Sequence, residues 1–269
     1  ALADARACGE VYPILRDYKH TVTPVGLPRV ILKASDVASI IGKNSFKKPT
    51  DVIDTLWHKY SPNTFVGKTK DQLGCEAIAE STVATIILED AKQFKSIDSS
   101  SVEQKTRAVI HKLDTSSGLE THKLDAAKEY IRKILYTNHG IRHEDRTAAK
   151  DPTLNMDDTF YTYNVCTIEG TVYDVVGRID RIVTNEDGTR TIVEIKNRTR
   201  GLFNSVREYE NIQCQAYMEM LDIDSCKLVE QYNDDIMTHH IRRNDEYWNK
   251  TILPKLNNFC ECFHSSISA

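Results

Sequence analysis

The first half of the chain carries apolar residues at helical spacing. Between residues 30 and 139 they recur every three or four positions, which is the period of an amphipathic helix. Helix starts are predicted at Ser35 and Asp36 and again at Pro49. A longer helix is predicted from Lys123 to a stop at residues 138–140, and a Ser-rich, charged stretch at residues 95–104 predicts an exposed loop. We therefore expect a large helical N-terminal part over about residues 1–139.

The second half changes to a period of two. Residues 161–168, 171–184 and 189–196 are rich in β-branched and aromatic residues, and they predict a three-stranded meander. A helix is predicted at residues 207–221, a short strand at 227–231 and a C-terminal helix at 247–263. This order predicts an α/β fold with a mixed central sheet flanked by helices. We expect the core at about residues 140–269 and the helical part to form one domain.

Composition excludes several classes of protein. The 269 residues are 40% hydrophobic, enough for a buried core, and the formal net charge of −4 gives no overall basic field for a polyanion. The most apolar run, residues 84–88, is far too short to span a membrane. Seven scattered cysteines do not form a disulfide framework and favour an intracellular, reducing compartment. The first residues lack the order of a secretory signal, so we expect no targeting information there.

The closely spaced cysteines Cys260 and Cys262 have one residue between them, whereas zinc-binding pairs usually have two or more. We interpret them as core residues of the C-terminal helix, in preference to metal ligands.

The most informative segment is a hairpin with charged residues near its base. A three-residue loop at residues 186–188, with Gly188 in the left-handed conformation, places Asp180 opposite Glu194. Facing side chains on one side of a sheet have Cβ atoms roughly 5 Å apart, so two carboxylates there repel unless a cation lies between them. Lys196 points to the same face, because it lies two residues after Glu194.

A divalent cation with hard oxygen ligands, most naturally Mg²⁺, fits such a carboxylate pair. The nearby lysine then suits water activation and charge neutralisation at a phosphodiester. An ordinary surface Glu–Lys pair is the alternative, but the facing Asp180 and the strand-forming residues before Glu194 favour the metal.

Gly177-Arg178-Ile179-Asp180 and Glu194-Ile195-Lys196 resemble the signature of the PD-(D/E)XK nucleases, with Ile179 in place of the proline. Flanking motifs, a Gly-x-x-x-Glu that ends at Glu144 and a Gln-x-Gln that starts at Gln213, resemble the YqaJ and lambda-exonuclease branch. The resemblance implies a restriction-endonuclease-like fold. It implies Asp180, Glu194, Glu144 and the Ile195 carbonyl as the metal site, with Lys196 as a catalytic residue.

The resemblance also gives Gln213 a supporting role at the site or toward the DNA. Without the family resemblance, ordinary amphipathic packing would be the better interpretation of the helix that carries Gln213. Glu76 and Glu80 follow a similar Gly-x-Glu sequence, but they lie far from Asp180 along the chain. We predict that both are surface carboxylates.

Near the N-terminus, about residues 29–49 resemble the opening segment of the lambda-exonuclease branch. A helix start with a serine hydroxyl suits a phosphate, and Lys43 and Lys47 add positive charge, although an ordinary helix cap with solvated lysines is the simpler alternative. In the lambda-exonuclease branch a serine and an arginine at this place hold the terminal 5′-phosphate. Ser35 and Arg29 are the matching positions here, so the resemblance implies that role for them. Residues 58–139 are expected to be a family-variable helical insertion.

The resemblance as a whole implies a Mg²⁺-dependent deoxyribonuclease, with Mn²⁺ as a substitute. Its expected activity is 5′ to 3′ exonuclease action on duplex DNA ends in viral or phage-type replication and recombination, with a single-strand annealing or binding protein as a possible partner. Two alternatives stay open. One is a structure-specific or restriction-like endonuclease, and the other is a non-catalytic DNA-binding protein on a nuclease fold. The intact set Asp180, Glu194 and Lys196 disfavours the second, because a binding module gains little from facing carboxylates beside a polyanion.

Overall fold

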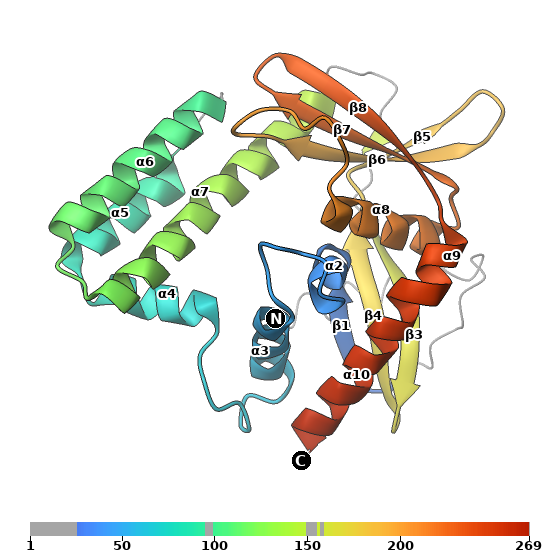
Figure 1. Ribbon diagram of the computed structural model, residues 1–269, viewed down its shortest axis with the longest axis horizontal. Helices are drawn as coiled ribbons and strands as arrows, with labels where there is room; N and C mark the ends of the chain where they lie inside the picture. Colours follow the sequence, from blue (N-terminus) through green and yellow to red (C-terminus); the bar gives the residue numbers. More distant parts are fainter. Residues whose placement is uncertain (1–25, 95–98, 149–154, 157–158, 269) are drawn as a thin grey trace.

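The computed structural model has an α/β part and a separate group of four helices (Figure 1). It describes residues 26–94, 99–148, 155–156 and 159–268, with the backbone alone described for residues 99, 140–148 and 155–156. The N-terminal elements are β1 (Arg29–Lys33), the 3-10 turn η2 (Ala34–Asp36), α2 (Val37–Ile40) and α3 (Pro49–Tyr60). The helical group comprises α4 (Lys70–Ala79), α5 (Thr82–Gln93), α6 (Ser99–Ser116) and α7 (Thr121–Ala148).

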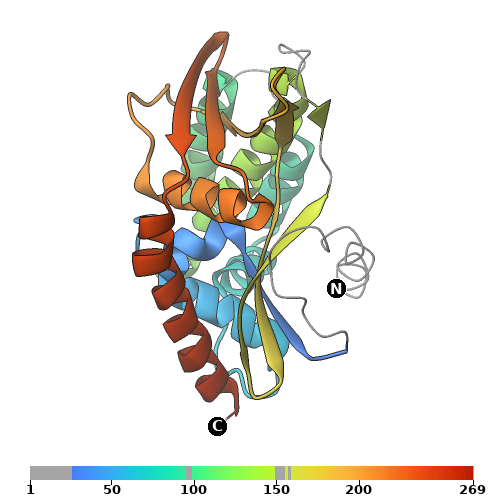
Figure 2. The same cartoon turned by 90° about the vertical axis from the view of Figure 1, so that its right-hand side faces the viewer.

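The rest of the chain alternates strands and helices. It contains β2 (Asn155–Met156), β3 (Phe160–Ile168), β4 (Thr171–Arg178), β5 (Arg181–Thr184), β6 (Arg190–Asn197), α8 (Glu208–Leu221), β7 (Ser225–Tyr232) and β8 (Asp235–Arg242). The C-terminal helical segment consists of α9 (Asp245–Tyr247), a π-helical turn η3 (Trp248–Ile252) and α10 (Leu253–Ser268). Figure 2 shows α10 along one side of the α/β part, where it packs on β3 and α2. None of the described helices has the length and apolar character to cross a membrane.

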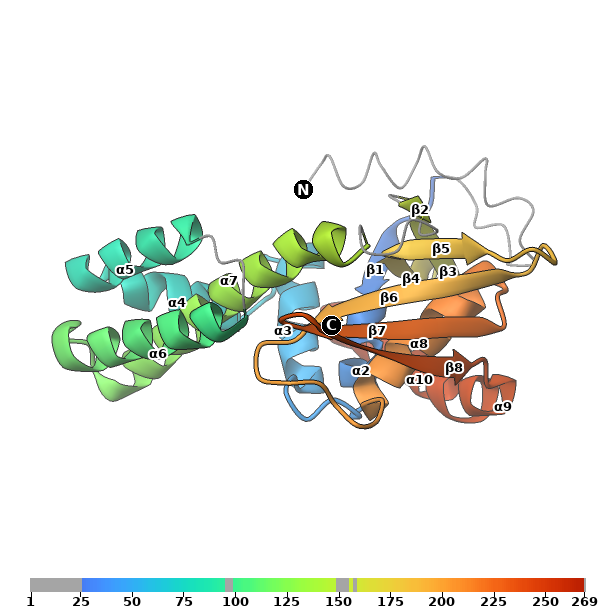
Figure 3. The same ribbon diagram turned by 90° about the horizontal axis from the view of Figure 1, so that it is seen from above.

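The strands form two mixed sheets. In the first, the order is β1-β4-β3, with β1 parallel and β3 antiparallel to β4. In the second, the order is β2-β5-β6-β7-β8, and only β6 and β7 are parallel among its pairs. Figure 3 shows β5 to β8 side by side. Helix α8 connects the parallel pair and packs in the main core between both sheets, so a fold with mixed sheets and flanking helices is confirmed.

The helical group has its own core. Buried residues of α4 to α7, such as Ala77, Ile87, Leu113 and Ile131, form a cluster separate from the main core. A small third cluster, with Val193 and Ile195 at its centre, lies on the face of β6 opposite the main core. Helix α7 contacts β6, which joins the helical group to the strand that carries the predicted site.

Several predicted boundaries differ from the structure. Residues 29–33 form the strand β1, because Val30 and Leu32 are buried where the chain pairs with β4, more than a hundred residues away in the sequence. Neither Ser35 nor Asp36 provides a side-chain cap, and the Asp36 carboxylate instead accepts from Lys47 at 2.7 Å. The predicted Pro49 helix start is confirmed.

The predicted helix stop is wrong, and so is the predicted loop over residues 99–104, while its residues 95–98 lie outside the described residues. Residues 99–104 form the first turns of α6, because Val102 is buried against the other helices. Helix α7 continues through Gly140, and its buried stripe at Ala127, Ile131 and Leu135 extends to His139. Tertiary packing thus outweighs the weak helix propensity of one glycine.

The predicted meander is divided between the two sheets. The chain leaves the first sheet after Arg178, which pairs with Phe160, and enters the second at Arg181, which pairs with Val193. The strand β8 escaped prediction because its sequence is polar, with Ile241 its only buried residue. Of the two C-terminal cysteines, Cys260 is buried as predicted and Cys262 is exposed.

Candidate functional site

Asp180 lies at the point where the chain passes from one sheet to the other. The predicted hairpin register is confirmed, since the pairs Arg181–Val193 and Thr184–Arg190 place Asp180 opposite Glu194. Gly188 has a φ of 81° in the turn. The backbone N–H of Ile195 donates to Asp180 Oδ2 at 2.8 Å. Burial raises the pKa of the Asp180 carboxyl, although that hydrogen bond and nearby Lys196 act in the other direction.

Glu194 and Lys196 project from the same face of β6, as the period of a strand requires. Lys196 Nζ donates to Glu194 Oε1 at 2.6 Å, and the Glu194 side chain is buried. Burial lowers the pKa of the lysine, but attraction and a hydrogen bond to Glu194 outweigh it, so the pKa of Lys196 is raised overall. We call Asp180, Glu194 and Lys196 the carboxylate–lysine cluster.

Helix α8 supplies polar partners for this cluster. Gln213 Nε2 donates to Glu194 Oε1 at 3.0 Å and to the Tyr217 hydroxyl at 2.8 Å. Lys196 Nζ lies 3.4 Å from Gln213 Oε1. Burial raises the pKa of Tyr217, as does nearby Glu194. Gln213 thus lies against the predicted site, and Tyr217, one turn later on the helix, holds its amide.

A second ionic cluster, which the sequence did not reveal, adjoins the first at the end of β6. Arg198 donates to both carboxylate oxygens of Glu210 on α8, at 2.7 and 3.0 Å, and also to Glu230 on β7. The backbone N–H of Phe203 donates to Glu230 Oε2 at 2.7 Å, and the guanidinium lies over the Phe203 ring. This arginine cluster (Arg198, Glu210 and Glu230) fixes the chain just after Lys196 to α8 and β7.

Ser35 lines a groove of about 370 Å³ next to the cluster. Tyr217 and the small residue Gly177 form part of its wall. A Cβ at Gly177 would lie 2.5 Å from the Tyr217 ring and 2.9 Å from Ala34, so this position requires glycine. Three cationic side chains that sequence reasoning missed, Lys33, Lys59 and Arg178, also line the groove.

The other predicted phosphate ligands are placed less directly. Arg29 begins β1, at the opposite end from Ser35, and forms an ion pair with buried Asp174 at 2.7 Å. Lys43 pairs with Glu208 at 3.0 Å, and Lys47 pairs with Asp36 at 2.7 Å. Both side chains of the Lys43–Glu208 pair are exposed, so an anionic ligand could displace that carboxylate at small cost, whereas Asp36 is largely buried.

The two upstream glutamates have different positions. Glu144 lies within the helical span of α7, but its side chain is outside the described residues. Glu76 on α4 is exposed and pairs with Lys68 at 2.5 Å, and exposed Glu80 pairs with Lys123 at 2.5 Å. The prediction that Glu76 and Glu80 are surface carboxylates is confirmed.

The donor set fits a hard divalent cation. Asp180 and Glu194 supply carboxylate oxygens, which Mg²⁺ prefers. A strand residue directs its N–H and C=O to the same side, so the Ile195 carbonyl faces the side on which its N–H meets Asp180. Within the described residues, no three His, Cys, Asp or Glu side chains form a metal-type group. Asp180 and Glu194 provide two carboxylate ligands, and the side chain of Glu144, the predicted third carboxylate ligand, lies outside the described residues.

Comparisons with solved structures give only weak likenesses. One is an alkaline exonuclease from Laribacter hongkongensis, with 14% identity, a TM-score of 0.40, and coverage of 72% of this chain and 94% of that one. Another is a phage-related exonuclease from Haemophilus somnus, with 13% identity, a TM-score of 0.37, and coverage of 88% and 96%. A comparison with curated protein sequences found no match.

A family model gives the decisive comparison. The model of the PD-(D/E)XK nuclease superfamily matches residues 78–242, more than half of the 269-residue chain. The match begins inside the segment expected to be a variable insertion, and it includes the whole carboxylate–lysine cluster. The chain therefore belongs to the PD-(D/E)XK nuclease superfamily.

Proposed function

We propose that this chain is a Mg²⁺-dependent deoxyribonuclease that acts as a 5′ to 3′ exonuclease on duplex DNA ends. The observation that carries the proposal is the convergence of Asp180, Glu194 and Lys196 at one point, with Glu194 and Lys196 in direct contact. Among the described side chains, Lys196 forms an ion pair with Glu194 and does not bridge two carboxylates as Arg198 does. The second carboxylate, held opposite in the hairpin register, costs repulsion that a bound divalent cation removes.

In this proposal Asp180, Glu194 and the Ile195 carbonyl hold the cation, with Glu144 as a further ligand. The cation would supply Lewis-acid catalysis and make water a better nucleophile. Lys196 orients the attacking water and offsets the negative charge that develops on the phosphate. Gln213 holds Glu194 Oε1 in place, and Tyr217 in turn holds the Gln213 amide.

The exonuclease part of the proposal depends on the groove beside the cluster. Ser35 lines it together with Lys33 and Lys59, and hydroxyl and ammonium donors suit a terminal phosphate. Arg29 was predicted from the family resemblance to share this role, but its ion pair with Asp174 also stabilises the β1–β4 pairing. Loss of Ser35 or Lys33 should slow cleavage of 5′-phosphorylated ends more than of 5′-hydroxyl ends. If substitution of Arg29 slows cleavage of 5′-phosphorylated and 5′-hydroxyl ends equally, then Arg29 stabilises the sheet and does not bind the terminal phosphate.

The experiment compares linear and closed-circular duplex DNA, with Mg²⁺, with Mn²⁺ and with a chelator. We expect degradation of linear DNA alone and only with a divalent cation. Asp180→Ala should lose both cleavage and Mn²⁺ binding measured by calorimetry, whereas Lys196→Ala should lose cleavage and keep binding. Glu76→Ala is the matched control and should change neither.

Two outcomes would replace the proposal. Efficient cleavage of closed circles would support the endonuclease alternative, which needs no terminal-phosphate groove. DNA binding without metal-dependent cleavage of any substrate would support a non-catalytic protein on this fold. Unchanged cleavage by Lys196→Ala would contradict the assigned role of that residue.

A further inference from the structure

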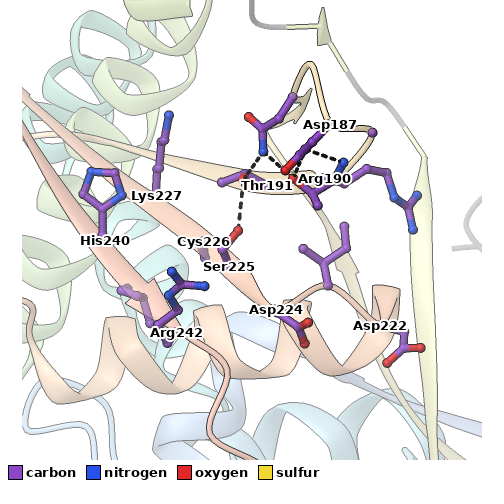
Figure 4. Close-up of a pocket in the computed structure, with 15 residues that line it drawn as sticks. Asp187, Arg190, Thr191, Asp222, Asp224, Ser225, Cys226, Lys227, His240 and Arg242 are labelled. Atoms are coloured by element: carbon purple, nitrogen blue, oxygen red, sulfur yellow. Dashed lines mark hydrogen bonds between the residues drawn. The ribbon is translucent and has the colours of Figure 1, made fainter.

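A polar hollow lies on the five-stranded sheet away from the carboxylate–lysine cluster. It has a volume of about 720 Å³ and lies among the 185–189 turn, the starts of β6 and β7, and the end of β8 (Figure 4). Ile192, Cys226 and Ile241 of these strands belong to the main core. Because side chains alternate along a strand, Thr191, Lys227, His240 and Arg242 project from the opposite side of the sheet, on which Thr191 is buried and His240 and Arg242 are exposed.

Three of these residues are basic and lie close together. Lys227 pairs directly with His240 in the β7–β8 register, and Arg242 is two residues further along β8. His240 and Arg242 are exposed and Lys227 is half-buried. Among the side chains that the structure describes, no carboxylate lies within ion-pair distance of any of the three. Lys227 and Arg242 are diagonal neighbours with like charges on one face of the sheet, an arrangement that destabilises strand pairing, and an anion at this point would relieve that repulsion.

Hydroxyl groups complete this end of the hollow. Thr191 Oγ1 and Ser225 Oγ lie 2.9 Å apart, and Ser225 pairs in register with Arg242. The three strands β6, β7 and β8 thus place two hydroxyls beside three basic side chains. We call Thr191, Ser225, Lys227, His240 and Arg242 the basic sheet face.

The acidic residues of the hollow have other partners or lie elsewhere. Asp187 accepts from the N–H and hydroxyl of Thr189 within the turn, at 2.9 and 2.6 Å. Asp222 pairs with Arg243 at 2.6 Å. Figure 4 shows Asp222 and Asp224 toward the end of the hollow away from Lys227 and His240. Asp187 and Asp222 are thus held by other groups, and Lys227 and His240 lie toward the opposite end of the hollow from Asp222 and Asp224.

We propose that the basic sheet face binds the phosphates of a second segment of nucleic acid, distinct from the segment that is cut. The lining contains no Phe, Tyr or Trp, so it offers cations and hydroxyls for a backbone and no aromatic surface on which bases could stack. Binding there is independent of base sequence. Because charge is the complementary feature, the occupant is a polyanionic backbone and not an apolar protein surface.

The position of the basic sheet face explains why a separate segment is needed. Lys227 pairs with Val193, the neighbour of Glu194 on β6. Glu194 projects toward α8, where it meets Gln213, and Lys227 projects from the other side of the same sheet. One phosphate cannot contact both. The basic sheet face would hold the uncut strand or a more distant stretch of the same DNA while the carboxylate–lysine cluster acts on the end.

Binding is tested with the full chain and chelator, so that no cleavage occurs. The probe is a fluorescent oligothymidylate of about twenty nucleotides, longer than typical single-strand site sizes. We expect Lys227→Gln/Arg242→Gln to weaken binding roughly tenfold near 0.1 M salt and to reduce the salt slope by about 1.4, from two lost contacts of about 0.7 each. The control Lys250→Gln/Lys255→Gln removes the same charge from the C-terminal helical segment and should leave the slope unchanged.

Lysine acylation with mass spectrometry locates the contact. The oligonucleotide should protect Lys227 and not Lys250, and millimolar inorganic phosphate should protect neither. Three results would overturn the proposal: equal slopes for the two double variants, protection of Lys227 by inorganic phosphate but not by the oligonucleotide, or protection without DNA that rises with protein concentration. The last would identify a second copy of the chain as the occupant. The difference in salt slope between the two double variants is measured without metal and without cleavage, so failure of this proposal is distinguishable from failure of the proposed nuclease activity.

Discussion

The carboxylate–lysine cluster and the arginine cluster have the same formal charges, two carboxylates and one cation, and both lie at the end of β6. They differ in how the carboxylates are held. Glu210 meets Arg198 through both of its oxygens, and Glu230 meets Arg198 and the Phe203 N–H. In the other cluster, Lys196 contacts one oxygen of Glu194, and Asp180 is held by a backbone N–H. A guanidinium holds two planar carboxylates in fixed positions, whereas an ammonium is a point charge that an incoming cation can replace.

The carboxylate–lysine cluster is therefore suited to chemistry, and the arginine cluster is suited to stabilising the fold. An arrangement whose members satisfy one another firmly holds three elements together, and it has little capacity to bind anything else. An arrangement with two facing carboxylates and a single flexible cation can exchange partners. The two cations, Lys196 and Arg198, are two residues apart in the sequence, and the clusters around them serve different purposes because their geometry differs.

The largest expected effect is loss of cleavage in Lys196→Ala. Lys196 is assigned both water orientation and charge neutralisation, so its removal should lower kcat by about 10³- to 10⁴-fold, which corresponds to about 4 to 5.5 kcal/mol. Single-turnover cleavage at saturating Mg²⁺ measures this effect. If Arg198→Gln, measured under conditions where it is folded, loses equally much, the division between the clusters is wrong.

The next effect is on stability, in Arg198→Ala. The substitution leaves two buried carboxylates without their main cation, so the free energy of unfolding should fall by about 3 to 5 kcal/mol. Denaturant unfolding measures the change. Replacing the whole cluster by Arg198→Met, Glu210→Leu and Glu230→Leu should recover most of it. Arg200→Ala is the control, because the Arg200 side chain is 78% exposed and such pairs contribute 0 to about 1 kcal/mol. If Arg200→Ala lowers the free energy of unfolding as much as Arg198→Ala does, then burial of the carboxylates does not explain the effect of Arg198→Ala.

The difference between the clusters also decides what could be predicted from the sequence. The carboxylate–lysine cluster follows from local information: the turn at Gly188 sets the register, and strand alternation puts Glu194 and Lys196 on one face. The arginine cluster joins β6, α8 and β7, and no sequence spacing relates Arg198 to Glu230. The same limit explains β1, whose partner β4 lies far along the chain, and β8, whose polar sequence does not show the alternation typical of a half-buried strand.

The continuation of α7 through Gly140 has the opposite origin. There the local signal was clear, with Asn138, His139 and Gly140 in succession, but a buried stripe on the helix outweighed it. Local patterns thus predicted the element types of the second half well, and long-range packing decided the ends of the elements and the residues that support the site.

A smaller effect is expected from overpacking at two glycines, one in each part of the molecule. A Cβ at Gly177 would meet the Tyr217 ring at 2.5 Å, and one at Gly74 would meet Tyr130 Cβ at 2.5 Å. Each alanine substitution should cost about 1 to 3 kcal/mol of stability. Only Gly177→Ala should also lower cleavage, because Tyr217 holds Gln213 against Glu194. The two variants are compared at a temperature where both are folded. Equal cleavage rates would show that Tyr217 does not help to position Gln213 at the site.

The smallest effect concerns Glu103, which connects the helical group to the chain after β6. Its Oε1 accepts from Tyr136 at 2.9 Å, Thr199 at 3.1 Å and Arg200 at 2.9 Å. Burial raises the pKa of Glu103, but these hydrogen bonds outweigh it, so the pKa is lowered overall. A folded-state pKa below the unfolded one means that the stabilisation is present at neutral pH. It is lost as the pH falls through the unfolded value of about 4.3 and then the folded value.

Glu103→Gln should therefore reduce the free energy of unfolding at pH 7, by no more than about 1 kcal/mol because Arg200 is exposed. Toward pH 3.5 the difference from wild type should shrink, since the wild-type carboxyl then becomes protonated too. Denaturant unfolding at both pH values measures this. Glu129→Gln, which removes an exposed carboxylate paired with Lys70, is the control and should show little change at either pH. A Glu103→Gln difference that grows in acid would mean that the carboxylate is destabilised in the folded protein, so that burial, and not its three donors, controls it.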